Sequence, residues 1–365
     1  MRCAAAASLD AFARAALEAL GSEPEEARVV AAHLVDANLA GHDSHGVGML
    51  PAYATHRRSG VLAANRRGRV AMENGPMAAI DGDGGYGQVI ARDAMEVALR
   101  LARAHGVAVV ALRRTHHIGR VGSYGEMAAE AGFASLHFVN GNSGPPPVAP
   151  WGGREGRFAT NPVCIAMPGS ARHPRFVLDF ATSRIAMGKV RVAHNSGTDV
   201  VEGALLDATG APTTDPGVMY RAPRGVLLPF GEHKGYGLAL ACDILAGIVG
   251  GAGTIQPGNP RDRGIVNGML SIVIDPARFG GGGAHEYDAL MDYVLGCAPA
   301  DAADPVKMAG DPERLSRARR LAEGIPVDDG TWSGLDALAA SLAIAPPDPL
   351  AAPRNGARTS DKDPT

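Results

Sequence analysis

The feature that most constrains the fold is a repeated change from helical to strand-like hydrophobic spacing along the chain. Within segment 85–105, apolar residues recur on one helical face: Ile90, Ala94, Val97 and Leu101. A short apolar stretch, 107–112, follows and is typical of a buried strand. The same change recurs as a predicted helix over 122–131 and a predicted strand over 133–139. We therefore expect a mixed α/β or α+β fold.

Two helices are expected to open the chain. The first has one apolar face and ends at Gly21: Leu9, Phe12, Ala16 and Leu20. Ser22 and Glu25 then form a candidate capping box for a second helix that ends near Leu39. The histidine-containing segment 42–45 is thereby placed in the loop after this helix.

Three further patterns complete the expected elements. Segments 77–80 and 177–180 predict strands. Segment 235–249 is almost entirely apolar, so it predicts a buried helix. Asp311-Pro312 begins a late helix that ends at Gly324.

Composition excludes several classes of protein. The 365 residues are 46% apolar, and no apolar run reaches the roughly 18–20 residues of a membrane helix. A net charge of −3 without a basic tract argues against a nucleic-acid partner. Four widely spaced cysteines and an amino terminus unlike a signal peptide indicate reduced thiols in the cytoplasm. The Pro-rich, polar segment 346–365 is expected to be a disordered tail.

Two histidine–glycine segments are candidates for acid–base chemistry, Ser44-His45-Gly46 and His117-Ile118-Gly119. Histidine is the side chain whose ordinary pKa allows proton transfer near neutral pH, although such residues are equally consistent with surface loops. His42 and His45 lack a third ligand at suitable spacing, so we expect no metal site.

Two other segments could bind a cofactor. Gly82-Asp83-Gly84-Gly85-Tyr86-Gly87 fits the dinucleotide pattern G-x-G-x-x-G, but the next strand ends in Arg113-Arg114 rather than an acidic residue. His233 and Lys234 precede the apolar helix, where free amides and a lysine favour an anion. Asp179, at the end of a strand, could orient a histidine or cap the following segment.

Seven segments in order resemble the malate/L-lactate dehydrogenase family of NAD(P)-dependent oxidoreductases over about residues 8–343. They are 44–47, 117–119, 149–154, 160–162, 179–183, 233–237 and 324–326. The variants at 48–51 and 116–120 are most similar to the bacterial 2-hydroxycarboxylate dehydrogenase branch.

The resemblance implies a non-Rossmann fold with a mainly antiparallel cofactor-domain sheet. The glycine pattern that begins at Gly82 is then not expected to bind the dinucleotide. It implies a homodimer and three regions. Residues 1–120 with about 276–345 form a substrate and dimerisation domain, about 121–275 bind the cofactor, and 346–365 remain the tail.

The resemblance also implies roles for individual residues. His45 corresponds to the acid/base on the substrate oxygen, supported by Ser44 and Asp179, and His117 to the proton acceptor assigned in some relatives. The expected NAD or NADP contacts, which include His45 and Asp179, are Gly119, Arg120, Val121, Val177, Leu178, Phe180, Ala181, His233, Lys234, Asn267, Gly310 and Asp311. Many relatives carry an arginine for the substrate carboxylate where Met49 stands, which leaves Arg120 as the nearest candidate.

The implied activity is hydride transfer between a nicotinamide cofactor and a 2-hydroxy or 2-oxo acid such as hydroxypyruvate, an aryl pyruvate, malate or lactate. One alternative is reduction of a cyclic imine 2-carboxylate. Another is an inactive ligand-binding relative, which should have lost the histidines or Asp179, and this chain has kept them.

Overall fold

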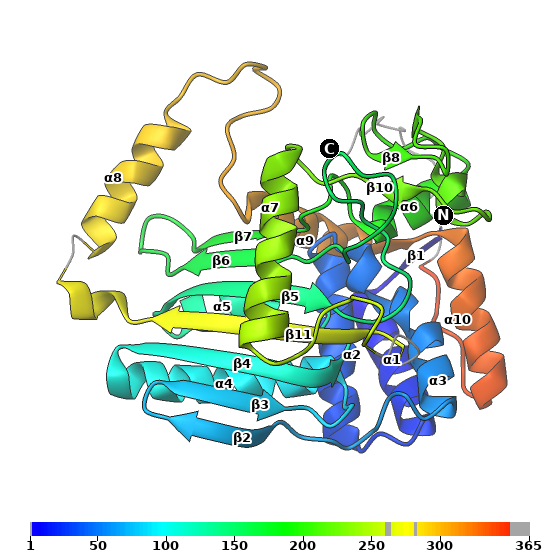
Figure 1. Cartoon of the computed structure of the whole chain (residues 1–365), viewed down its shortest axis with the longest axis horizontal. Helices are drawn as coiled ribbons and strands as arrows, with labels where there is room; N and C mark the ends of the chain where they lie inside the picture. The colour runs from blue at the N-terminus through cyan, green and yellow to red at the C-terminus, as the bar shows by residue number, and fades with distance from the viewer. Residues whose placement is uncertain (1, 260–263, 281–282, 351–365) are drawn as a thin grey trace.

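A central mixed sheet organises the computed structural model, which describes residues 2–259, 264–280 and 283–350 (Figure 1). Within these residues the sheet has seven strands, and only β3 and β4 pair in parallel. In spatial order they are β2 (Arg69–Asn74), β3 (Met77–Asp81), β4 (Val107–His116), β11 (Val266–Ile274), β5 (Ala134–Gly141), β6 (Val163–Met167) and β7 (Phe176–Phe180). The expected mixed fold with a mainly antiparallel sheet is confirmed.

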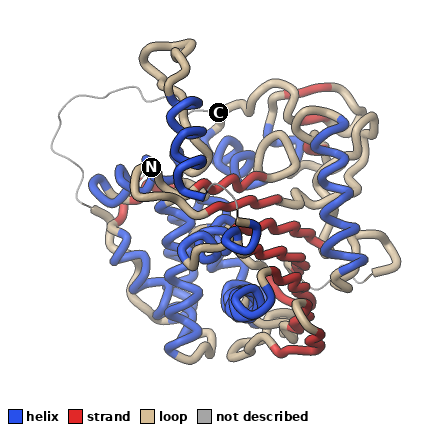
Figure 2. Tube along the Cα trace, turned by 90° about the vertical axis from the view of Figure 1, so that its left-hand side faces the viewer, coloured by secondary structure: helices blue, strands red, loops and turns tan. Residues whose placement is uncertain are grey.

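Helices cover both faces of this sheet (Figure 2). Helices α4 (Gly87–His105) and α5 (Gly122–Glu130) bury one face, and their apolar side chains join those of the strands in one core. The other face carries α7 (His233–Cys242), which continues as a π-helix, η4 (Asp243–Val249). The expected helix over 235–249 therefore changes its hydrogen-bond pattern at Asp243.

The apolar helix α7–η4 is not buried on all sides, which corrects the prediction. Ile248 and Val249 are each 66% exposed, and Leu240 and Ile244 are also exposed. The buried side of the helix faces the sheet through small residues such as Ala239, Ala246 and Gly247. The apolar sequence predicts burial of the whole helix, but within the described part of the chain only the side that faces the sheet has a packing partner.

A second core joins the amino-terminal helices to the carboxy-terminal ones. It contains α1 (Ala6–Ala19), α2 (Pro24–Leu39), α3 (Leu50–Arg58) and α10 (Asp329–Leu342), packed around the buried Trp332. Strand β1 (Arg2–Ala4) pairs with β12 (Ile325–Val327) and ties the two ends together. The predicted capping box is absent, because Glu23 is the N-cap and its amide donates to Oδ1 of Asn65 at 2.7 Å.

The remaining elements lie outside the central sheet and the two cores. A small sheet contains β8 (Leu205–Leu206), β9 (Pro212–Thr213) and β10 (Val226–Leu227), near α6 (Met187–Ser196) and the 3-10 turn η3 (Pro216–Met219). After the turn η5 (Pro276–Phe279), helix α8 (Gly283–Leu295) projects away from the main body (Figure 1), and α9 (Asp311–Glu323) returns to α2.

Two expectations concern regions rather than elements. Strand β4 lies before residue 120 yet pairs with β11 in the sheet that also holds β5 to β7, so the expected domain division remains a prediction. Residues 351–365 of the expected tail lie outside the described residues. Its beginning packs on the amino terminus, where the Leu350 amide donates to the Cys3 carbonyl at 2.7 Å. Among the described helices, none has the length and hydropathy of a membrane span.

Candidate active site

His45 and His117 form a directly bonded pair at the junction of the two cores. His45 ends the 3-10 turn η1 (Asp43–His45), and His117 follows β4. Nδ1 of His45 lies 3.0 Å from Nε2 of His117, and the two rings stack with centroids 5.2 Å apart. The structure therefore joins the two histidines that the sequence presented as alternatives.

The pair continues into the protein through two residues that sequence analysis missed. The hydroxyl of Tyr53, on α3, lies 2.7 Å from Nδ1 of His117. Gln88, on α4, donates from Nε2 to the same hydroxyl at 2.6 Å. Because Tyr53 accepts from Gln88, its proton points to His117, whose Nε2 proton points to His45. The Nε2 proton of His45 is then left for a ligand.

Both histidines are held in the neutral state. Burial lowers the pKa of His45 to about 3, assisted by the positive charges of His42, Arg120 and Arg191. Burial, followed by the electrostatic cost of charging a ring beside His45, also lowers the pKa of His117 well below its usual value. A neutral imidazole has one N–H donor and one acceptor, which an ordered chain of hydrogen bonds requires.

The loop that carries His45 is fixed from α2 and α9. Oδ1 of Asn38 accepts from the Val47 amide at 2.9 Å, while Arg320 donates to both Asp43 oxygens at 2.7 and 3.0 Å. A Cβ at position 46 would overlap the Asn38 amide, so the motif glycine allows this close approach. The Ser-His-Gly segment is therefore held in place by buried polar contacts.

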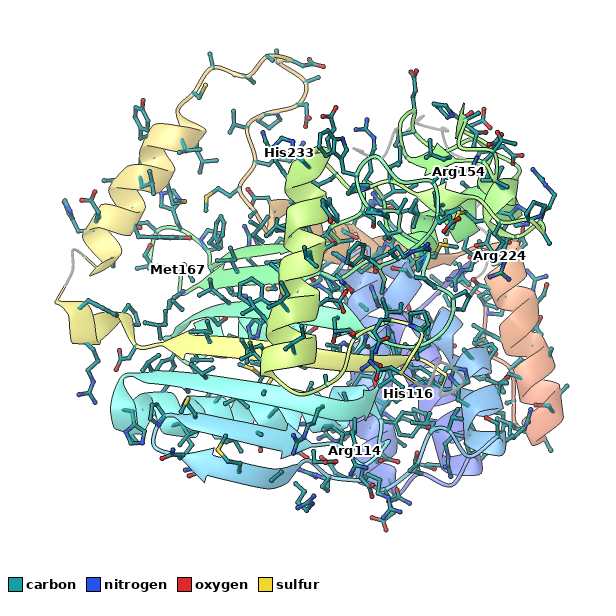
Figure 3. All side chains as sticks on the ribbon, in the orientation of Figure 1. Arg114, His116, Arg154, Met167, Arg224 and His233 are labelled. Atoms are coloured by element: carbon teal, nitrogen blue, oxygen red, sulfur yellow. The ribbon has the colours of Figure 1, made fainter. Side chains whose placement is uncertain are left out.

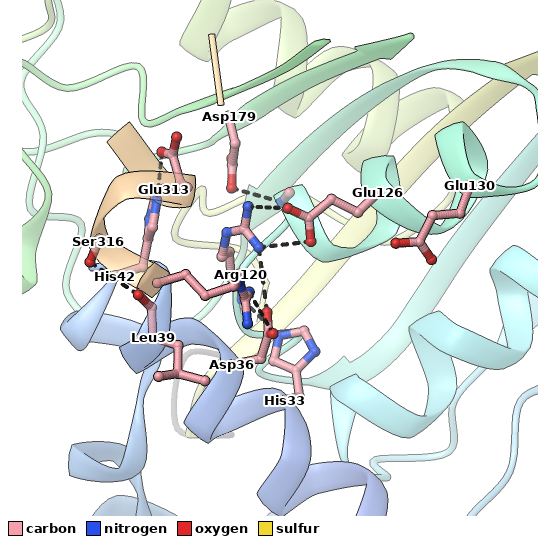
Figure 4. A network of polar contacts seen from close by, with 12 residues as sticks. His33, Asp36, Leu39, His42, Arg120, Glu126, Glu130, Asp179, Glu313 and Ser316 are labelled. Carbon is pink, nitrogen blue, oxygen red and sulfur yellow. Dashed lines mark hydrogen bonds and ion pairs between the residues drawn. The ribbon is translucent and has the colours of Figure 1, made fainter. Parts of the chain in front are cut away.

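Asp179 does not bond to either histidine in the described structure. Its Oδ2 accepts from the Gly122 amide at 2.7 Å and thus caps α5 (Figure 4). Burial raises the pKa of Asp179, opposed by the charges of His42 and Arg120. His42, whose charge acts on Asp179, lies 3.1 Å from Glu313. Asp179 therefore belongs to the group of polar residues around the site and does not orient a histidine directly.

Arg120 is occupied by carboxylates rather than free to bind one. The side chain is 1% exposed, and its two terminal nitrogens donate to Glu126 at 3.0 and 2.8 Å. Asp36 lies 3.5 Å from Nη1, and the backbone amide of Arg120 donates to His33 at 3.0 Å (Figure 4). The guanidinium charge is therefore already balanced within the protein.

The expected cofactor residues come from segments that contact one another. Oδ1 of Asn267 accepts from the Ile118 amide at 3.1 Å, which joins β11 to the 118–121 loop. The Val177 amide donates to Ala309 at 3.3 Å, which joins β7 to the loop containing Gly310 and Asp311. Phe180 packs edge-on against Phe230, which precedes α7.

The amino end of α7 lies at the surface near the end of β7. His233 and Lys234 are exposed there, and Figure 3 shows His233 at the end of α7. The ring of His233 contacts that of Trp151, with centroids 5.7 Å apart. Glu232, the N-cap residue, makes no side-chain capping bond. A lysine beside such a helix end fits an anion, as a cofactor phosphate would require.

The glycines of 82–87 have a packing role. They connect β3 to α4 in the parallel β3–α4–β4 unit. A Cβ on Gly87 would overlap the carbonyl oxygens of His116 and His117, and one on Gly82 would lie 2.9 Å from Cβ of Thr115. These glycines thus let the turn approach the end of β4 that carries His117.

Comparison with known proteins shows the family of this chain. A model of the malate/L-lactate dehydrogenase family matches residues 4–336. The chain belongs to this family. Hydroxycarboxylate dehydrogenase B of Escherichia coli (strain K12) is 43% identical over 90% of this chain and 91% of the relative. An L-lactate dehydrogenase of Cupriavidus necator is 40% identical over 87% of this chain and 91% of that relative.

A solved structure supports the same family fold. Sulfolactate dehydrogenase from Methanocaldococcus jannaschii superposes with a TM-score of 0.80 at 33% identity, covering 94% of this chain and 98% of that chain. The family resemblance and the non-Rossmann fold expected from the motifs are thereby confirmed. Membership makes this chain an oxidoreductase of the hydroxy-acid dehydrogenase type.

Proposed function

We propose that the protein is an NAD(P)-dependent oxidoreductase that interconverts 2-hydroxy and 2-oxo acids. The observation that carries the proposal is the ordered chain from Gln88 through Tyr53 and His117 to His45, which presents one N–H to a ligand. Reduction of a ketone requires a proton donor at the carbonyl oxygen, and a positioned histidine is the usual one.

His45 is the proposed acid. The substrate oxygen takes the Nε2 proton of His45, and solvent returns a proton to Nε2 after the product leaves, while His117 keeps its hydrogen bond to Nδ1. Ser44 is proposed to support the loop, and Asp179 to contribute negative charge near His42 and Arg120. When bound, NAD or NADP supplies or accepts the hydride at its nicotinamide ring.

The residues present fit such a cofactor. We assign its phosphates to the amino end of α7 with His233 and Lys234. The rest of the cofactor is assigned to three segments, Gly119–Val121, Val177–Ala181 and Gly310–Asp311, together with Asn267, because these are joined by the contacts described above. We propose no metal, and the described residues contain no cluster of three or more His, Cys, Asp or Glu suited to one.

A homodimer accounts for the apolar surface. Leu240, Ile244, Ile248 and Val249 are exposed along α7–η4, and Tyr293 on α8 is 82% exposed. Exposed apolar residues that form a stripe, rather than standing singly, mark a contact surface. We place the dimer in the cytoplasm, since all four cysteines are free thiols.

A substrate panel tests the proposal. Purified protein should oxidise NADH or NADPH with hydroxypyruvate, an aryl pyruvate, oxaloacetate or pyruvate, and activity should survive a chelator. A cyclic imine 2-carboxylate belongs in the same panel. Turnover of the imine alone would replace the proposed substrate class, and no turnover at all would favour a ligand-binding protein.

A further inference from the structure

Helix α6 lies directly against the loop that carries His45. Gly188, in its first turn, leaves no room for a side chain, because a Cβ there would overlap Cβ of Ser44. Arg191 lies three residues later, and residues three apart share one face of a helix. Arg191 therefore faces the same loop as Gly188.

The guanidinium of Arg191 reaches the segment just after His45. A Cβ built on Gly48 would lie 3.2 Å from Nη2 of Arg191, which places that nitrogen over the glycine backbone. The charge is close enough to contribute to the lowered pKa of His45. A substituent at residue 48 would compete with the arginine for this space.

Arg191 lacks a carboxylate of its own within the described residues. Its Nε is buried without a hydrogen-bond partner. Asp328, the N-cap residue of α10, lies close enough for the charge of Arg191 to help lower its pKa. Its oxygens nevertheless accept from Thr331 at 2.8 and 2.6 Å and from Asn195 at 3.1 Å, and form no ion pair with Arg191. A buried guanidinium nitrogen without an acceptor is costly unless a ligand supplies one.

The other candidates for binding a substrate carboxylate are unsuitable. Nε of Arg120 also lacks a partner, but its two terminal nitrogens are paired with Glu126 and Asp36, so its charge is balanced. Met49 packs against the apolar core of the amino-terminal helices and carries no charge. In the described structure, Arg191 is thus the arginine beside His45 whose charge is not balanced by an ion pair.

We propose that Arg191 binds the carboxylate of the 2-oxo acid substrate and so selects for acids. The inference rests on the proposed function. The carboxylate is bonded to the carbon whose oxygen faces His45, so its acceptor oxygens lie only two bonds from the reacting carbon. Arginine suits this position because its planar fork can donate two parallel hydrogen bonds to a carboxylate.

The test compares Arg191→Gln and Arg191→Lys with wild type, using the best 2-oxo acid of the panel and its methyl ester. Loss of a charged hydrogen-bond donor should raise KM for the acid about 10- to 100-fold in Arg191→Gln. KM for the ester should hardly change, so the preference for the acid should collapse. Arg191→Lys keeps the charge without the fork and should show a smaller loss.

Lys189→Gln is the matched control, because Lys189 is an exposed cation on the same helix and should retain wild-type constants. NADH affinity, measured by fluorescence titration, should be unchanged in every variant. An unchanged acid preference in Arg191→Gln, beside an active wild type, would overturn the inference alone. If that variant fails to fold, the same preference measured in Arg191→Lys decides. A wild type inactive on every acid would overturn the proposed function and this inference together.

Discussion

Nδ1 of His45 lies 3.0 Å from Nε2 of His117, although the residues are 72 positions apart in the sequence. The contact makes the two imidazoles one unit in which His45 is the outer member and His117 the inner one. Tyr53 and Gln88 complete the unit from α3 and α4. The predictions below follow from the order of these four residues.

Replacing the outer histidine should mainly reduce turnover. General acid–base catalysis contributes about 10²–10⁴-fold, so His45→Ala should lower kcat by this factor while cofactor affinity stays near wild type. The measurement is steady-state kinetics with a fluorescence titration of NADH. Near-normal turnover in His45→Ala, with none in His117→Ala, would assign the proton transfer to His117.

Removing the phenolic hydroxyl should affect both stability and turnover. Tyr53→Phe leaves Nδ1 of His117 and Nε2 of Gln88 without their shared partner, and an unpaired buried polar group costs about 1–3 kcal/mol. We expect the free energy of unfolding in urea to fall by that amount, with a lower kcat. Tyr287→Phe, which removes an exposed hydroxyl bonded to the Pro174 carbonyl, is the control. Equal stability losses in the two variants would contradict the chain.

Stability should decrease as pH falls below about 6.5. Burial lowers the pKa of His33, His45 and His116 to about 3 and of His137 to about 4, so these side chains stay neutral when folded. The unfolded chain binds their protons near pH 6.5, and each such proton costs about 1.4 kcal/mol of stability per pH unit.

The stability that these neutral histidines contribute is fully present above pH 6.5 and is lost progressively between about pH 6.5 and 3. Urea unfolding at pH 7.5, 6.5, 5.8 and 5.2 measures it, since carboxylates titrate mostly at lower pH. A flat or rising free energy of unfolding across this series would show that the histidines are not held neutral by the fold.

Lys234→Ala should weaken cofactor binding more than it slows the reaction. An anion contact made equally in the ground and transition states raises KM without a matching loss of kcat. We expect an increase of about tenfold in the Kd of NADH or NADPH, as for other charged contacts at partly exposed sites. Lys189→Ala serves as control, and a loss confined to kcat would place Lys234 at the reacting centre.

A charged substitution in the exposed apolar stripe on η4 should prevent the proposed dimer from forming. Ile248→Asp places a charge on a residue that is 66% exposed, so the subunit should fold normally but elute as a monomer. Light scattering coupled to size exclusion measures the mass. Met72→Glu, on the edge strand β2, controls for an added charge elsewhere. A wild-type protein that is monomeric at micromolar concentration would refute the homodimer.

Local patterns predicted most elements, because helices and buried strands have characteristic spacings. Helix α4, for example, spans Gly87–His105 within the expected 85–105. Strand β4 continues to His116 rather than ending at Leu112, since pairing with β11 extends it past the apolar run. Long-range pairing of this kind leaves little trace in the local sequence.

The site was only partly predictable for the same reason. The motif segments indicated His45 and His117 separately, but their bond depends on how β4 meets the loop after α2. Tyr53 and Gln88 stand in ordinary helical sequence, where nothing distinguishes a relay residue from a core one. Arg191 likewise becomes a candidate for binding the substrate carboxylate only when the structure shows that Arg120 is already paired with acidic residues.

The most direct test of the proposed function follows the hydride itself. Cofactor deuterated at nicotinamide C4 should be incubated with the best 2-oxo acid, and the product examined by proton and deuterium NMR. The account predicts deuterium at C2 of the 2-hydroxy acid, with the rate of transfer greatly reduced in His45→Ala. A product without deuterium at C2 from either face of the labelled cofactor would contradict it.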